Sequence, residues 1–275
     1  MEKQMIMNTN DRPVRILVPP PALLKADGSP DGEKMKRYYL WMAEKGINGL
    51  FINGSTGEFT LLSDAQKVET VRIAKEVLGD RMFLIAGAIS GSARQCCALA
   101  EEYKKAGADA IAVCPPYFFK HGQEGIKTFM QEVAANSVLP LYLYDIPAFT
   151  SPMTYETIVE LSSHPNIHGL KDSSRDFARF QGLLHTIKAK RPEFKIYTGS
   201  EELLLASLIM GGDGATVATG GIEPEKIMQI VSLYRQGDLE EARKVQFSLL
   251  DSIRGWFVKD FPEGFRDAVA QKGFL

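Results

Sequence analysis

Short apolar runs alternate with longer amphipathic segments along most of the chain. Three stretches end a helical pattern on glycine and turn directly into residues typical of strands: EKGINGLFING (44–54), KAGADAIAVCPP (105–116) and MGGDGATVATGG (210–221). Glycine commonly ends helices because it adopts the left-handed conformation at little steric cost. Repeated junctions of this kind predict parallel strands that are joined by helices.

Eight apolar runs fit strands, and a segment with helical spacing follows each of them. The predicted strands cover residues 15–23, 47–54, 82–88, 109–116, 139–147, 167–174, 194–200 and 214–219. Helical spacing is clearest in 63–79, 92–107 and 224–237, with Ser63 and Ser92 as N-caps. Eight such units predict an α/β fold, the (β/α)8 TIM barrel, which usually takes about 250 residues. A doubly wound open sheet is the alternative, but no Gly-rich dinucleotide turn follows the first strand.

Residues after the eighth unit have the pattern of additional helices. Helical spacing covers 238–260 and 263–273, after a barrel of about residues 14–237. We therefore expect one domain over residues 1–275, a TIM barrel with extra C-terminal helices.

Composition favours a small-molecule ligand. The chain has 34 acidic and 32 basic side chains and no basic block, so we expect it to bind neither nucleic acid nor a membrane. Cys96, Cys97 and Cys114 fit no disulfide or metal-ligand spacing, and this usage is typical of a reducing cytoplasm. The N-terminal MEKQMIMNTNDRP lacks the apolar core of a signal peptide, which also favours a cytoplasmic location. His164 and His168 are separated by a proline and form no helical ligand pair, and no GxGxxG follows a strand, so neither a metal nor a dinucleotide cofactor is predicted.

One lysine stands at the end of a predicted buried strand, in the sequence GLKDSS (169–174). A buried ammonium group is costly unless it is paired or loses its proton, and a neutral lysine is a nucleophile. Gly169 and Ser173 share its strand face by period two, which leaves room beside the amine. The alternative is a structural ion pair between Lys171 and Asp172, Asp145 or Glu58.

Other strand ends deliver polar groups to the same end of the predicted barrel, where TIM barrels hold their active sites. Tyr144 ends the neighbouring strand, so it is either a proton shuttle for chemistry at Lys171 or a core aromatic. The turn GSTGE (54–58) places Ser55 and Thr56 between glycines, where they hold a carboxylate or merely connect two elements. Glu201 follows the seventh strand in an acidic pair that suits substrate hydroxyls, or else forms a solvated first turn of a helix.

The motifs GSTGE, YDIP (144–147) and GLKDSS, in this order and each at a strand end, resemble those of the dihydrodipicolinate synthase/N-acetylneuraminate lyase family of Schiff-base aldolases. The resemblance covers about residues 14–273. It implies that Lys171 forms an imine with pyruvate or another 2-oxo acid, without a metal or cofactor. It also implies that Tyr144 and Thr56 take part in catalysis and that Ser55 and Thr56 hold the carboxylate.

Departures from the family pattern bear on the substrate. Phe149 stands where the synthases carry an arginine that clamps a second carboxylate, and Phe118 matches a second tyrosine of their proton relay. The acidic pair resembles the sugar-acid branch, so the resemblance implies a class I aldolase that acts on a 2-keto-3-deoxy sugar acid and gives pyruvate and an aldehyde. Substrate contacts then extend to a further set of positions, namely Tyr117, Ser173, Gly199, Glu201 and Thr216.

Three further expectations accompany this interpretation. The resemblance implies a homotetramer or homodimer, in which an aromatic residue at Tyr117 or Phe118 crosses a subunit interface. An imine-forming dehydratase or a condensing enzyme of the synthase type is the alternative within the enzymes. A non-catalytic sensor of 2-oxo acids is the alternative outside them.

Overall fold

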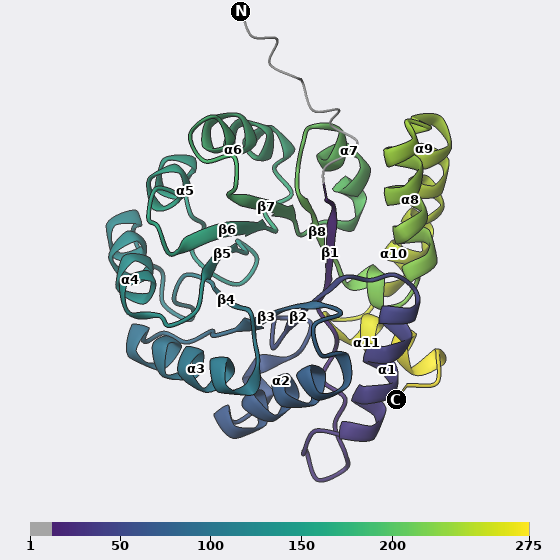
Figure 1. Ribbon diagram of the computed structural model, residues 1–275, viewed down its shortest axis with the longest axis horizontal. Helices are drawn as coiled ribbons and strands as arrows, with labels where there is room; N and C mark the ends of the chain where they lie inside the picture. Colours follow the sequence, from purple (N-terminus) through teal and green to yellow (C-terminus); the bar gives the residue numbers. More distant parts are fainter. Residues whose placement is uncertain (1–12, 275) are drawn as a thin grey trace, which may run out of the picture.

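The computed structural model describes residues 13–274, and their strands form a closed barrel that is surrounded by helices (Figure 1). The strands follow one another around the barrel in sequence order, all parallel, and β8 closes onto β1. The predicted TIM barrel is therefore confirmed. The open-sheet alternative is wrong because β1 and β8, which would be available as edges, pair with each other.

The elements have the following bounds. The strands are β1 (Arg15–Val18), β2 (Gly49–Ile52), β3 (Phe83–Gly87), β4 (Ala110–Val113), β5 (Leu141–Asp145), β6 (Ile167–Asp172), β7 (Lys195–Thr198) and β8 (Gly214–Thr216). The helices are α1 (Gly32–Glu44), α2 (Asp64–Leu78), α3 (Ala93–Ala106), α4 (Gln123–Asn136), α5 (Tyr155–Leu161), α6 (Phe177–Lys190), α7 (Leu204–Ile209), α8 (Pro224–Gln236), α9 (Leu239–Ser248), α10 (Leu250–Trp256) and α11 (Glu263–Gln271). Short 3-10 turns are η2 (Phe59–Leu61), η3 (Glu201–Leu203) and η4 (Ala218–Gly221).

Every strand ends earlier than its predicted run. Pro19 and Pro115 follow β1 and β4, and proline lacks the N–H that a strand ladder needs. Asn53 follows β2 with a φ of 58°, which turns the chain out of the sheet. The residues of each predicted run that follow the strand lie in loops, or for Ala218 and Thr219 in η4, at the C-terminal ends of the strands. Those loops carry the candidate site.

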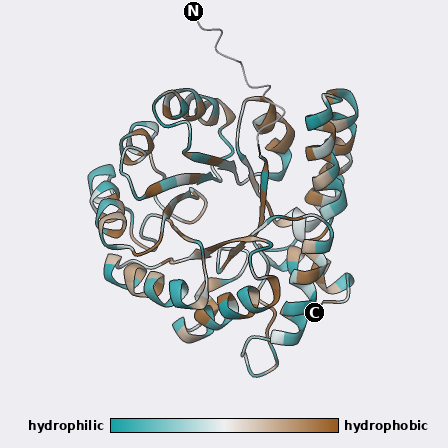
Figure 2. Ribbon diagram, viewed as in Figure 1, coloured by the Kyte–Doolittle hydropathy of each residue, from teal (hydrophilic) through white to brown (hydrophobic). Residues whose placement is uncertain are grey.

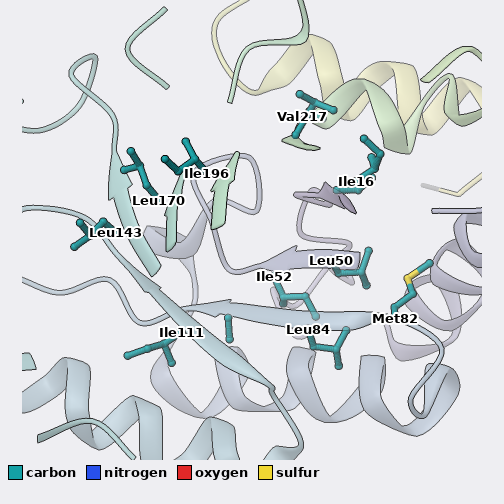
Figure 3. Close-up of a cluster of buried hydrophobic side chains, with 14 of the residues drawn as sticks. Ile16, Leu50, Ile52, Met82, Leu84, Ile111, Leu143, Leu170, Ile196 and Val217 are labelled. Atoms are coloured by element: carbon teal, nitrogen blue, oxygen red, sulfur yellow. The ribbon is translucent and has the colours of Figure 1, made fainter. Parts of the chain in front are cut away.

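Alternate residues of each strand pack on opposite faces of the barrel wall. Figure 3 shows the outward set, including Leu50, Leu84 and Ile196, which belongs to the core that the strands share with the surrounding helices. A second, separate cluster includes Phe51 and Tyr142 and fills the barrel interior. Polar residues occupy much of the outer sides of the helices (Figure 2).

The C-terminal helices follow α8 and lie on one side of the barrel, beside α8 and α1 (Figure 1). The predicted helical segment 238–260 is divided between α9 and α10, which meet at Leu249. No helix within residues 13–274 has the length and apolar character that crossing a membrane requires.

The two predicted N-caps differ in their hydrogen bonds. Ser63 forms a capping box, in which its hydroxyl accepts from the Gln66 N–H and its own N–H donates to the Gln66 side chain. Ser92 occupies the N-cap position of α3, but its hydroxyl caps no backbone N–H. Its own N–H donates to the Ser90 Oγ, at 3.2 Å. The capping hydrogen bond expected of Ser92 is therefore absent.

Candidate active site

A cavity of about 410 Å³ opens at the C-terminal ends of the strands. Its walls come from the loops after β2, β5, β6, β7 and β8 and from the C-terminal segment around α10 and α11. The structure brings together seven of the predicted site residues here, namely Thr56, Tyr144, Lys171, Ser173, Gly199, Glu201 and Thr216. The strand ends thus converge on one space, as the barrel geometry requires.

The other two predicted site residues, Ser55 and Tyr117, line an adjoining pocket of about 340 Å³. The two spaces share Ile146, Phe149 and Phe261 in their walls. Tyr117 packs edge-on against Phe59, with 5.8 Å between the ring centroids. Within this chain Tyr117 does not line the Lys171 cavity, so its proposed contact with substrate stays a prediction.

Lys171 and Tyr144 are direct neighbours on β6 and β5, since their Cα atoms are partners in the strand register. The Lys171 Nζ lies 4.1 Å from the centre of the Tyr144 ring and 4.6 Å from that of Phe51. Lys171 is only 7% exposed. Its amine is thus held among aromatic rings inside the barrel.

The structural ion pair considered for Lys171 does not form. Asp145 and Asp172 instead accept hydrogen bonds from Arg179, at 2.5 and 2.8 Å. Glu58 pairs with Arg266, at 3.4 Å. Across residues 13–274, no carboxylate lies within salt-bridge distance of the Lys171 Nζ.

Burial without a counterion lowers the pKa of Lys171 to about 7, although the nearby Glu201 and Cys114 oppose this shift. A large fraction of the amine is therefore neutral near pH 7, whereas an ordinary lysine is almost fully protonated there. A neutral amine that faces a cavity can attack a carbonyl carbon.

The Tyr144 hydroxyl lies 3.2 Å from the Ser55 Oγ. Burial raises the Tyr144 pKa, and hydrogen bonds with Ser55 and Ser173 only partly offset that effect. The phenol therefore keeps its proton at neutral pH, and the serine beside it can pass a proton onward.

Glu201 lies in η3 at the end of β7 and is 5% exposed. Its Oε1 accepts from the Ala218 N–H at 3.0 Å, and burial raises its pKa. Gln246 of α9 supports this turn, because its side-chain amide donates to the Glu201 carbonyl and accepts from the Leu205 N–H. A C-terminal helix thus fixes the position of a cavity residue, a contact that the local sequence did not indicate.

Two glycines near the lysine have different roles. A side chain at Gly199 would place its Cβ 2.0 Å from the Ser173 Oγ, so any other residue there would displace the Ser173 hydroxyl. A Cβ at Gly169 would lie 2.5 Å from the ring of Tyr142. The expectation that Gly169 leaves room beside the amine is therefore wrong, because Tyr142 fills that space.

Sequence reasoning missed two arginines after β6. Arg179 of α6 binds Asp145 and Asp172, and Arg175 lines the cavity. The seven-residue spacing from Asp172 to Arg179 could have suggested an ion pair between these two residues, whereas no local sequence feature indicated the pair between Arg179 and Asp145. In the part of the chain that the structure describes, no three or more His, Cys, Asp or Glu side chains gather as a metal site would require.

A further cavity, of about 490 Å³, lies at the opposite ends of the strands, around Arg15 and Asp213. Asp213 is neutralised there by Lys188 and Lys195. That cavity lacks a buried nucleophile beside a proton donor. The cavity around Lys171 is therefore the candidate active site.

Both the sequence and the fold match known proteins. The sequence profile of the Dihydrodipicolinate synthetase family matches residues 12–275. A probable 2-dehydro-3-deoxy-D-pentonate aldolase, YjhH of Escherichia coli K12, is 30% identical over 86% of this chain and 79% of its own length. The 4-hydroxy-tetrahydrodipicolinate synthase of Acidiphilium cryptum is 33% identical over 90% of this chain and 84% of its own. The crystal structure of E. coli YagE in complex with pyruvate matches with a TM-score of 0.88 and 29% identity, over 94% of this chain and 87% of that chain.

Proposed function

Since this chain belongs to the dihydrodipicolinate synthetase family, a family of lyases, we propose that it is a class I aldolase for a 2-keto-3-deoxy sugar acid. The reaction gives, or consumes, pyruvate and an aldehyde. The observation that carries the proposal is the buried Lys171 amine, which has no counterion among residues 13–274, lies against Tyr144 and faces a cavity.

In the proposed reaction, the neutral Lys171 amine attacks the C2 carbonyl of the substrate, and loss of water gives an iminium ion. The C3–C4 bond then breaks, and its electron pair moves toward the iminium nitrogen to form an enamine. The C4 hydroxyl loses its proton as the aldehyde forms. Protonation of C3 and hydrolysis of the imine release pyruvate and restore the amine.

Tyr144 is the proposed proton carrier. Its ring lies against the amine and its hydroxyl is within hydrogen-bond distance of Ser55, so a proton from the C4 hydroxyl has a short path away from the substrate. Thr56 lines the same cavity, and we propose that the GSTGE turn binds the carboxylate next to the reacting carbonyl.

The sugar-acid specificity rests on the other side of the cavity. Glu201 can accept hydrogen bonds from substrate hydroxyls, and we propose that Thr216 donates one. The Thr216 Oγ1 is buried and has no hydrogen-bond partner within residues 13–274, which is unusual for a buried hydroxyl. Phe149, which also lines the cavity, has no charge with which to clamp a second carboxylate. The cavity thus lacks the synthase clamp at this position, whereas Glu201 and Thr216 offer partners for substrate hydroxyls.

Relatives named as synthases keep a condensing enzyme of that type as the second candidate. A dehydratase that uses the same imine would differ in its products. An aldolase releases pyruvate from a sugar acid, whereas a dehydratase leaves the carbon chain intact. We also propose that the protein acts as a homotetramer or homodimer, with Tyr117 at a subunit interface.

The first test is to trap the imine. The protein is incubated with pyruvate and sodium borohydride, weighed intact and mapped by peptide mass spectrometry. A reduced pyruvyl adduct on Lys171 is expected, and Lys171→Met should abolish it. Lys195→Met is the matched control, because Lys195 also lies on a strand but pairs with Asp213 at the other end of the barrel. Absence of an adduct in folded wild-type protein would overturn the proposal.

The second test identifies the reaction. Candidate 2-keto-3-deoxy sugar acids are incubated with the enzyme, and free pyruvate is measured by a coupled lactate dehydrogenase assay. Release of pyruvate in proportion to substrate loss supports the aldolase. Loss of substrate without pyruvate, with an intact carbon skeleton by mass spectrometry, would establish the dehydratase instead.

A further inference from the structure

Arg175 has an unusual backbone conformation for an arginine. It lies in the loop between β6 and α6, four residues after Lys171, with a φ of 64°. The left-handed region crowds the Cβ of ordinary residues and costs roughly 1–2 kcal/mol, so glycine, asparagine and aspartate are its usual occupants. Strain of this kind is often found at ligand-binding positions.

The guanidinium group of Arg175 has no polar partner among residues 13–274, since it makes neither an ion pair nor a hydrogen bond to them. It lies over an aromatic ring, that of Phe257, whose centre is 5.3 Å away. The neighbouring Asp176 is already engaged, because its carboxylate caps α6 by accepting from the Arg179 N–H. Arg175 therefore keeps its full capacity to bind an anion, whereas Arg179 is bound to two carboxylates.

Arg175 also lines the same cavity as Lys171. The Arg175 side chain is exposed at this wall, to which the C-terminal segment supplies Phe257, Phe261 and Phe265. The cation–π contact with Phe257 restricts the guanidinium before any ligand binds. Glu201 lines the cavity as well, but its Oε1 is held by the Ala218 N–H.

We propose that Arg175 determines specificity by binding a terminal anionic group of the substrate, on the end remote from the 2-oxo acid. The inference rests on the proposed function, in which the 2-oxo acid end is fixed at Lys171 and the GSTGE turn. A planar guanidinium binds a carboxylate or a phosphate through two parallel hydrogen bonds. The preferred substrates are then acids whose far terminus bears a carboxylate or a phosphate in place of a neutral hydroxymethyl group.

The test uses three aldehydes that differ only at their terminus. D-Glyceraldehyde is neutral, D-glyceraldehyde 3-phosphate carries a phosphate, and tartronate semialdehyde carries a carboxylate. Each is condensed with pyruvate, and kcat/KM is measured from the product by mass spectrometry. Wild-type enzyme should prefer one of the two anionic aldehydes over D-glyceraldehyde by at least about tenfold, and which of them it prefers distinguishes carboxylate from phosphate.

Arg175→Asn removes the charge with a residue that accepts the left-handed backbone, so the fold should be kept. It should reduce the anionic-to-neutral ratio of kcat/KM to near one, mainly through KM, and Arg175→Lys should retain part of the preference. Arg243→Asn, an exposed arginine on α9, is the matched control and should leave the ratio unchanged. A wild-type preference for D-glyceraldehyde, or an equal loss for all three aldehydes in Arg175→Asn, would overturn the proposal.

A binding experiment separates this proposal from the aldolase itself. Glycerol 3-phosphate, tartronate and glycerol are titrated calorimetrically into wild type and Arg175→Asn, with no turnover required. An anion that binds wild type at least fivefold more tightly than the variant supports the anion site even if no pyruvyl adduct forms on Lys171. Equal affinities of wild type and Arg175→Asn for these anions would refute the proposal, even if the pyruvyl adduct forms on Lys171.

Discussion

Replacing Arg179 by methionine should destabilise the protein more than any exposed charge substitution. The Arg179 guanidinium donates to Asp145 at 2.5 Å and to Asp172 at 2.8 Å, and these carboxylates are 0% and 2% exposed. Methionine leaves both acids buried without their counterion. The Asp145 carboxylate then accepts a hydrogen bond only from the Met153 N–H, and the Asp172 carboxylate still accepts one from the Ser174 N–H.

Removal of one partner from a buried ion pair costs about 3–5 kcal/mol, because the other charge stays buried. That loss corresponds to a fall in unfolding temperature on the order of 10 °C for a domain of this size. Urea unfolding followed by circular dichroism measures the free energy directly. Arg72→Met, which removes an exposed pair with Glu69, is the control and should cost less than about 1 kcal/mol.

A second substitution tests the cause. Adding Asp145→Asn to Arg179→Met removes one stranded charge and should recover part of the lost stability. Arg179→Met should also move the acid limb of imine formation to higher pH, since uncompensated carboxylates near Lys171 raise its pKa. A loss below about 1 kcal/mol, or a double variant no more stable than Arg179→Met, would refute this account of the pair.

Three further predictions concern the cavity. The rate of borohydride trapping with pyruvate should rise with a midpoint of about pH 7 and then level off, because the Lys171 amine attacks only when neutral. Glu201→Gln should lower the midpoint of this pH profile, because it removes a charge that raises the Lys171 pKa. Lys171→Met should stabilise the fold most at and below pH 7, because the buried ammonium of the wild-type protein opposes folding there. The gain in stability should shrink toward pH 10.5, above which the amine is neutral in both the folded and the unfolded chain. Urea unfolding midpoints of the two proteins at pH 6 and pH 10 measure this difference. Gly199→Ala should cost about 1–3 kcal/mol in thermal unfolding and slow adduct formation, because its methyl group would collide with Ser173.

The fold could be predicted because its signals are local. Glycine ends a helix and an apolar run begins within a few residues, as at Gly107 before β4, so the order of strands and helices is visible without knowledge of distant contacts. The strand ends were predicted too far along the chain, since apolar character continues through Pro19 and Pro115 after the ladder has stopped. Hydrophobic pattern reports burial, and the loops at this end of the barrel are buried as well.

The candidate site was predictable where a residue and its neighbour both stand at strand ends. Lys171 and Tyr144 meet because parallel strands in sequence order place their ends side by side. Arg175 and Gln246 could not be found in this way. The role of Arg175 depends on a loop conformation and on Phe257 from the C-terminal segment, and that of Gln246 depends on how α9 packs against η3.

The alternation of side chains along β5 and β6 explains how a neutral lysine coexists with two adjacent acids. Asp145 and Asp172 directly follow Tyr144 and Lys171, so a strand turns them to the opposite face of the barrel wall. There Arg179 neutralises both, while the amine and the phenol face the cavity. If either acid faced inward, its charge would hold Lys171 protonated and the amine could not attack a carbonyl. The period of the strand thus separates the ion pairs that support the fold from the amine on which the proposed chemistry depends.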